Sequence, residues 1–168
     1  MQSRVHLRLM TNTGVPHALK LTSDKLAGVH KIWLELATGP IGPKREEITP
    51  ARLRGTMPWT FLIDVADGDF RFRFAGDRII QFIGRRLQGA LLSEFRGTPF
   101  FEGMHRFFSR GAEAKIPLAN GPAPVTYPGK EHLEMEVMIL PLSEDGITVS
   151  GFLGAFDTWQ IGTHASVR

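Results

Sequence analysis

The sequence predicts a single α+β domain, in which a five-stranded antiparallel sheet carries helices on one face and an amphipathic helix precedes the first strand. Apolar and polar residues alternate over residues 60–75, which is the period of strands. The apolar spacing then becomes that of helices as far as residue 114, and further strands follow. This order of strands, helices and strands is typical of the α+β class.

The composition is that of an ordinary globular protein. The chain has 168 residues, of which 42% are hydrophobic, a formal net charge of +3 and no cysteine. The lack of cysteine excludes disulfides, thiolate metal sites and cysteine nucleophiles. No run of about 18 apolar residues and no signal peptide is recognisable, so we expect a cytoplasmic protein without a membrane span. We expect an N-terminal arm, one domain and a C-terminal tail, over residues 1–22, 23–157 and 158–168.

The first strand pair is predicted in most detail. Asp67-Gly68 lies between the two alternating runs and favours a two-residue hairpin turn, because such a turn needs positive φ at both positions. This turn places apolar residues opposite one another on one face and Asp64 opposite Arg71 on the other. The predicted apolar pairs are Val65 with Phe70, Ile63 with Phe72 and Phe61 with Phe74.

Helices are predicted before and after this hairpin. Apolar residues recur at helical spacing over Ser23–Thr38, with Ser23 as N-cap, and this helix either covers the outer face of the sheet or mediates oligomer contact. A helical turn is expected at Pro50–Arg54, where proline suits the first position. A short helix that ends at Gly84 follows the hairpin, and a longer one with Thr98 as cap extends to Ala114.

Three strands are predicted after the helices. An edge strand is expected at Pro124–Tyr127, because proline is tolerated in edge strands. Long strands are expected over His132–Leu142 and Ile147–Phe156. The later half of the first long strand is apolar on both faces, so both faces of the sheet need cover.

Short motifs in the chain resemble those of the stand-alone bacterial PAS family. They are Pro43-Lys44-Arg45, Met57-Pro58, Asp64, Phe72-Arg73-Phe74-Ala75-Gly76, Gly84-Arg85-Arg86-Leu87-Gln88-Gly89, and Leu140-Pro141-Leu142 followed by Asp145-Gly146. Met57 departs from the leucine usual in that family. The resemblance covers residues 30–157 and implies the PAS strand order 2-1-5-4-3 and a sensory or regulatory role.

Motifs for catalysis or metal binding are not evident. Glu102 and His105 have the spacing of half a di-iron site, but the sequence lacks a second copy. His105 is either a haem ligand, as in haem-binding PAS domains, or a half-exposed side chain at the edge of an apolar stripe. We expect no catalytic residue, metal or cofactor, because the predicted inner faces carry no group that could move a proton.

Between sheet and helix we predict an apolar pocket, which either binds a small hydrophobic ligand or is filled by its own side chains. Its candidate residues are Phe61, Ile63, Phe72, Phe74, Ile83, Met104 and Phe108. Clustered arginines form either a solvated surface or a patch for an anion or an acidic partner. These are Arg71, Arg73, Arg78, Arg85 and Arg86.

We interpret the chain as a PAS-like sensory or regulatory module that acts by small-ligand binding, by protein association or by both. The alternatives are a ligand-free adaptor protein and a small α+β enzyme. The expected partners are a second copy of the chain, an unidentified regulatory protein and a small molecule. We expect no nucleic acid, since the aromatic residues alternate to the buried face, and no membrane, since a long apolar run is lacking. The candidate self-association residues are Val29, Ile32, Trp33 and Leu36, with Trp33 as anchor.

Overall fold

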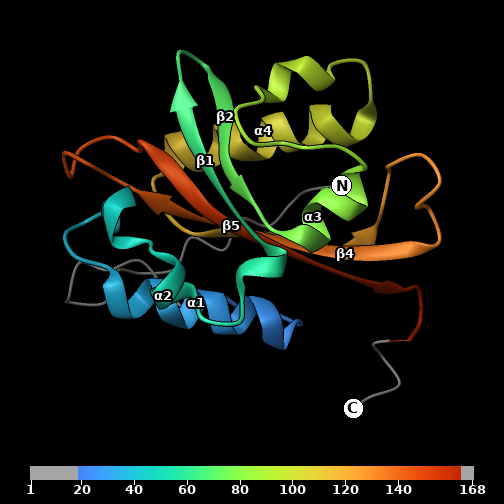
Figure 1. Cartoon of the computed structure of the whole chain (residues 1–168), viewed down its shortest axis with the longest axis horizontal. Coiled ribbons are helices and arrows are strands. Elements are labelled where there is room, and N and C mark those ends of the chain that lie inside the picture. Colours follow the sequence, from blue (N-terminus) through green and yellow to red (C-terminus); the bar gives the residue numbers. More distant parts are fainter. Residues whose placement is uncertain (1–18, 164–168) are drawn as a thin grey trace.

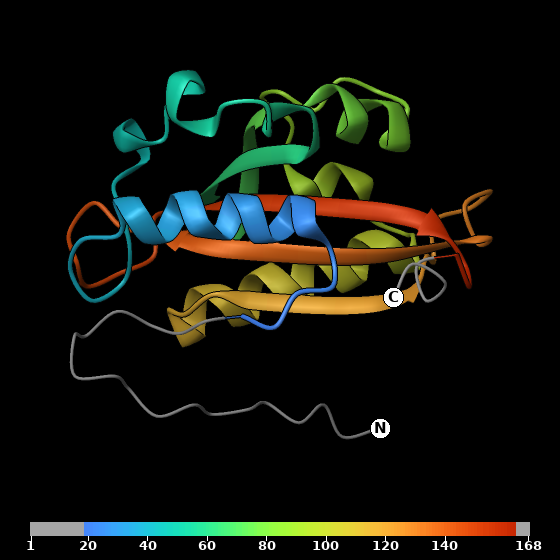
Figure 2. The same cartoon turned by 90° about the horizontal axis from the view of Figure 1, so that it is seen from below.

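A five-stranded antiparallel sheet with strand order β2-β1-β5-β4-β3 forms the centre of the computed structural model, which describes residues 19–163 (Figure 1). The helices α3 and α4 lie on one face of the sheet and α1 lies along β4 and β5 on the other (Figure 2). The strands are β1 (Thr60–Ala66), β2 (Asp69–Ala75), β3 (Leu118–Pro124), β4 (Leu133–Leu142) and β5 (Gly151–Gln160). The helices are α1 (Asp24–Leu36), α2 (Pro50–Leu53), α3 (Asp77–Ile83) and α4 (Pro99–Ala114), with short 3-10 segments at Arg45–Glu47 (η1), Met57–Trp59 (η2) and Leu92–Phe95 (η3).

The β1–β2 hairpin confirms most of the predicted register. Ile63 pairs with Phe72, Asp64 with Arg71, and Val65 with Phe70, around the Asp67-Gly68 turn. A β-bulge in β2, opposite the step from Leu62 to Ile63, changes the remainder of the ladder.

The pairing of Phe61 with Phe74 is the part of the register that was predicted wrongly. Because a bulge inserts one extra residue into a strand, the alternation of side chains in β2 restarts one position later. Phe61 therefore lies opposite Ala75, and Phe74 lies opposite Leu62. Ala75 belongs to the buried core, whereas Phe74 is half-buried and turns to the outer face.

The outer face of β4 and β5 is covered by α1, as predicted. Ser23 caps the helix by accepting a hydrogen bond from the backbone N–H of Leu26. The buried carboxylate of Glu136 accepts hydrogen bonds from the backbone N–H groups of Thr22 and Ser23, at 2.9 and 2.8 Å, and so holds the start of the helix against β4. The apolar residues of this layer are Leu26, Val29, Trp33, Leu36, Met138, Leu140, Leu142, Leu153 and Ala155.

The inner face packs against α3 and α4. Thr98 caps α4 and Pro99 occupies its first turn, and Gly84 ends α3 with a positive φ of 85°, all as the sequence predicts. The helix α4 approaches the sheet closely at Gly111, where a Cβ atom would lie 2.6 Å from Cδ1 of Ile139. This close approach lets the phenylalanines of α4 pack in the core.

The strand β4 begins at Leu133, one residue after its predicted start, but the other two of the last three strands begin several residues from their predicted starts. The edge strand β3 spans Leu118–Pro124 instead of Pro124–Tyr127, and a bulge between Asn120 and Ala123 accommodates Pro122, which cannot donate a hydrogen bond. The strand β5 begins at Gly151 instead of Ile147. The carboxylate of Asp145 accepts hydrogen bonds from the N–H groups of Ile147 and Thr148, both at 2.8 Å, which lengthens the turn.

The chain ends also differ from the expected division. Residues 158–160 pair with residues 133–135 of β4, so this part of the predicted tail is strand. Most of the predicted arm lies outside the described residues, but Leu19 and Leu21 pack against the outer layer. Over residues 19–163, no helix is both long and apolar enough to cross a membrane.

Candidate functional site

The predicted apolar pocket is a cavity of about 30 Å³ between the sheet and the helices α3 and α4. Ligand pockets usually enclose roughly 300–1,000 Å³, so this space is about tenfold too small. All of its lining residues are apolar: Phe61, Phe72, Ile79, Ile83, Leu87, Leu92, Phe100, Phe101, Met104, Phe108, Val137 and Phe156.

Aromatic rings fill the space between the sheet and the helices in which the sequence predicts an apolar pocket. The ring of Phe108 lies 5.9 Å from that of Phe61 and 5.3 Å from that of Phe70, between centroids. Phe61 also makes an edge contact with Phe72, at 6.1 Å. Such spacings are those of directly packed aromatic pairs, so the core is closed by its own side chains.

Of the seven predicted pocket residues, five line this cavity. Ile63 does not, although it is almost fully buried in the same core. Phe74 does not because the β-bulge turns it to the outer face, and its assignment to the pocket is therefore wrong.

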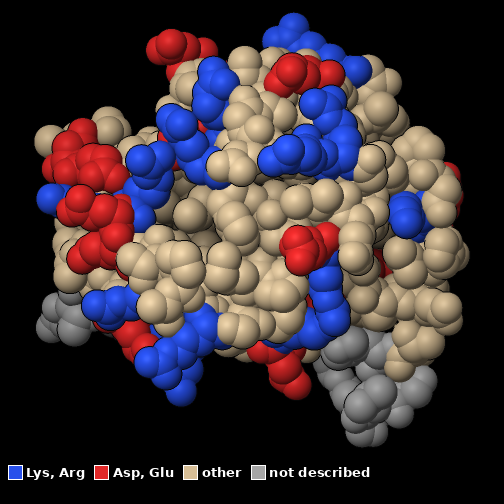
Figure 3. All heavy atoms as spheres, in the orientation of Figure 1, with Lys and Arg blue, Asp and Glu red and all other residues tan. Residues whose placement is uncertain are grey.

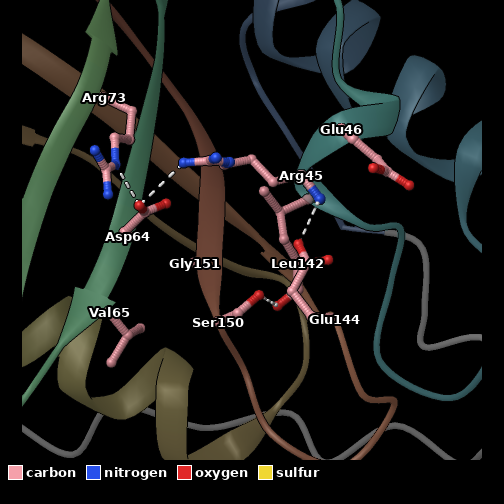
Figure 4. Close-up of a pocket in the computed structure, with 9 residues that line it drawn as sticks. All are labelled: Arg45, Glu46, Asp64, Val65, Arg73, Leu142, Glu144, Ser150 and Gly151. Carbon is pink, nitrogen blue, oxygen red and sulfur yellow. Dashed lines mark hydrogen bonds and ion pairs between the residues drawn. The ribbon is translucent and has the colours of Figure 1, made fainter.

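A second, larger hollow of about 330 Å³ lies at the surface (Figure 4). We call it the outer groove. It brings together η1, the hairpin β1–β2, the end of β4 and the start of β5. The lining residues are Arg45, Glu46, Asp64, Val65, Arg73, Leu142, Glu144, Ser150 and Gly151.

Two arginines meet on one carboxylate in the outer groove. Nη1 of Arg45 lies 3.2 Å from Oδ2 of Asp64, and Nε of Arg73 donates to the same oxygen. Figure 4 shows the two guanidinium groups reaching Asp64 from opposite sides. Both arginine side chains are about half exposed, at 48% and 51%, whereas that of Asp64 is 19% exposed.

Backbone contacts place Arg45 at the groove. Its N–H donates to Oε1 of Glu144 at 3.0 Å, and the N–H of Ser143 donates to the carbonyl oxygen of Pro43 at 3.0 Å. The β4–β5 turn that carries Glu144 is itself held by Asp145. Hydrogen bonds from the backbone of Thr148 and Ile147 lower the pKa of the Asp145 carboxyl well below its usual range, because they stabilise the charged form.

The predicted arginine patch is divided among separate partners. Arg71 donates to the carbonyl oxygen of Gly89 at 2.9 Å, and Arg73 pairs with Asp64. Arg78 lies over the ring of Trp59, whereas Arg85 lies over that of Phe95. Figure 3 shows Lys and Arg side chains in several groups on the side of the molecule that faces the viewer in Figure 1. Of the five predicted residues, only Arg73 belongs to the outer groove.

Most of the predicted self-association residues are core residues. Val29 and Trp33 are fully buried within the chain and Leu36 nearly so, because α1 lies on its own sheet. Trp33 as the anchor of a dimer is therefore wrong. Ile32 remains half-buried, and Leu34 on the same helix is 40% exposed.

The histidines have different environments. His105 is exposed on α4, with its ring 5.5 Å from that of Phe70. His30, which sequence reasoning missed, is buried on α1, and its Nε2 has no hydrogen-bond partner among the described residues. Burial lowers the pKa of His30, because the charged ring loses hydration. Over residues 19–163, no three His, Cys, Asp or Glu side chains are grouped as metal ligands would be.

Sequence reasoning also missed the outer groove as a site, although it named Arg45, Asp64 and Arg73 in separate motifs of the PAS resemblance. These motifs are the one feature of the sequence that groups the three residues together. A family model described as a PAS domain matches residues 21–157. No curated protein and no solved structure matches the chain.

Proposed function

The chain belongs to the PAS domain family, and on this premise we propose that it is a regulatory module that acts by associating with another protein, without a ligand in its core. The family supports a sensory or regulatory role in general. The observation that favours association is the closed interior, in which aromatic side chains leave a cavity of only about 30 Å³.

A role without catalysis is part of the same proposal. The cavity is lined by apolar side chains, none of which can donate or accept a proton. Tyr127 lies close to it, but its hydroxyl donates to the carbonyl oxygen of Ile83 at 2.8 Å. This hydrogen bond occupies the hydroxyl group of Tyr127.

Native mass spectrometry of the purified protein tests the proposal directly. We expect this measurement to give the mass of the bare chain or of its assemblies. In a separate thermal-shift measurement, we expect indole, a small apolar probe, to leave the melting temperature of the wild type unchanged. The matched variant Met104→Ala enlarges the cavity from its half-buried wall, and we expect it to be stabilised by indole because an apolar void binds apolar molecules. A stoichiometric bound mass on the wild type, or stabilisation of the wild type by indole, would contradict the proposal.

A sensor of a small hydrophobic ligand is the second candidate. It is favoured by Met104, whose flexible side chain forms part of the cavity wall and can adapt to an occupant. In that case the wild type itself responds to apolar probes, and Met104→Ala changes which sizes are accepted. The same thermal-shift measurement with indole therefore separates the two candidates.

A further inference from the structure

We propose that the outer groove binds a small anion through carboxylate or phosphate oxygens, with Arg45 and Arg73 as its donors. This site lies outside the apolar core and goes beyond the association proposed above. The first support is size: the groove encloses about 330 Å³, which falls in the range of small-molecule sites, in contrast to the core cavity.

The second support is the number of free donors. A guanidinium group carries five N–H bonds. Arg73 uses its Nε, and Arg45 one bond of Nη1, on the same oxygen of Asp64. Among residues 19–163, no other acceptor is bonded to either side chain. Within the described part of the chain, the terminal nitrogens of Arg73 are therefore open for the paired hydrogen bonds that arginine makes to carboxylates and phosphates.

The third support is the local balance of charge. Next to Asp64 two positive groups share one negative group, whereas the lining of the whole groove carries two arginines and three acids. Of the other acids that line the groove, Glu46 points away from Asp64 in Figure 4, and Glu144 accepts the backbone N–H of Arg45. An anionic group is thus favoured only directly beside the two guanidinium groups, while Glu46 and Glu144 disfavour a negative group elsewhere in the groove.

The fourth support is that the groove is formed before any ligand arrives. Arg45 is held through its main chain, and the adjoining turn is fixed by the hydrogen bonds of Asp145. At Gly151 a Cβ atom would lie 2.5 Å from the carbonyl oxygen of Ile63, so β5 approaches β1 closely and leaves no side chain there. Sites arranged in advance lose less entropy on binding.

The alternative is that Arg45, Asp64 and Arg73 only brace the connector against the sheet. Exposed ion pairs contribute about 0–1 kcal/mol to stability, so variants of these arginines should stay folded and can be compared in binding. Arg73→Lys keeps the positive charge but loses the planar pair of donors. Arg86→Gln is the matched control, because Arg86 is exposed and lies outside the groove.

The test is an NMR titration of the arginine Nε–H signals with two probes, lactate for a carboxylate and inorganic phosphate, at ionic strength held constant with sodium chloride. We expect saturable shifts at Arg73 and Arg45. The affinity should fall by about tenfold or more in Arg45→Gln and Arg73→Lys, the loss expected for a charged hydrogen bond, and stay unchanged in Arg86→Gln. Saturation with one probe alone identifies the source of the oxyanion and supports the site.

Two results would overturn the proposal. Shifts that do not saturate, or that chloride reproduces, would show ionic screening without binding. Equal affinity of the wild type, Arg45→Gln and Arg73→Lys would place any binding elsewhere and leave the groove a structural contact. Melting curves of all variants confirm that each remains folded during the titration.

Discussion

Nε1 of Trp33 lies 3.0 Å from the carbonyl oxygen of Pro141 and donates a hydrogen bond to it, which fastens α1 to β4. The same tryptophan is fully buried between the helix and the sheet. The contact explains why this large residue is part of the fold and not of an interface. Several properties of the protein depend on such pairs of residues.

Trp33→Phe removes the Nε1–H donor and leaves the buried carbonyl oxygen of Pro141 without this hydrogen bond. We expect the free energy of unfolding to fall by about 2–4 kcal/mol, from the unpaired acceptor and the lost volume. The matched control is Trp59→Phe, because the buried Nε1 of Trp59 has no partner among the described residues and no hydrogen bond is lost. Urea unfolding of both variants measures the difference, and equal losses would contradict the role given to the hydrogen bond.

Ile63→Asp should unfold the domain. Ile63 is 1% exposed in the inner core, and an unpaired charge there costs several kcal/mol. Leu62→Asp, one position away on the outer face, should keep the fold, because Leu62 is half-buried. Circular dichroism melts decide this, and the opposite order of stability would mean that the two faces of β1 are reversed.

The bulge in β2 predicts unequal effects of two neighbouring phenylalanines. Phe72→Ala should cost about 3–5 kcal/mol, since it empties a buried aromatic position. Phe74→Ala should cost less than about 2 kcal/mol, because the half-buried ring lies outside both core clusters. Similar losses in denaturant unfolding would indicate the regular register without the bulge.

His30 should make stability depend on pH below neutrality. Its pKa in the folded state is lowered by burial, so between this value and the unfolded value of about 6.5 the unfolded chain binds more protons. The free energy of unfolding is therefore highest above about pH 6.5 and decreases as the pH falls toward the folded pKa.

The measurement is urea unfolding between neutral pH and about pH 5, where carboxyl groups with lowered pKa values have not yet gained protons. His30→Gln should reduce the slope with pH, whatever its effect on stability at neutral pH. His105→Gln is the control, because His105 is exposed. A wild-type slope that persists in His30→Gln would assign the effect to another group.

Self-association through α1 stays a prediction, carried now by the exposed Leu34 and the half-buried Ile32. We expect a dimer in sedimentation velocity at high micromolar concentration. Leu34→Glu should produce a monomer with an unchanged melting temperature, and Ile32→Glu should act in the same direction. A wild type that sediments as a monomer at this concentration would leave α1 as cover for the sheet alone.

The sequence by itself determined the features that depend on near neighbours in the chain. The Asp67-Gly68 turn, the caps at Ser23 and Thr98, and the end of α3 at Gly84 were all predicted at their observed positions. Turn and cap preferences arise within about four residues, so no distant contact can easily displace them. The two-sided apolar pattern in the later half of the strand expected at His132–Leu142 likewise predicted that both faces of the sheet are covered, because side-chain direction in a strand has a period of two.

Only the tertiary structure decided where distant segments meet and how closely they pack. The bulge that turns Phe74 outward depends on pairing across β1 and β2, and periodicity alone predicts an unbroken ladder. Whether the aromatic core is open or closed depends on ring positions from several elements at once. The outer groove joins Arg45 to Asp64 across 19 positions of sequence and to Glu144 across 99. No local preference encodes such contacts, because they form only when the connector, the hairpin and the last turn pack together.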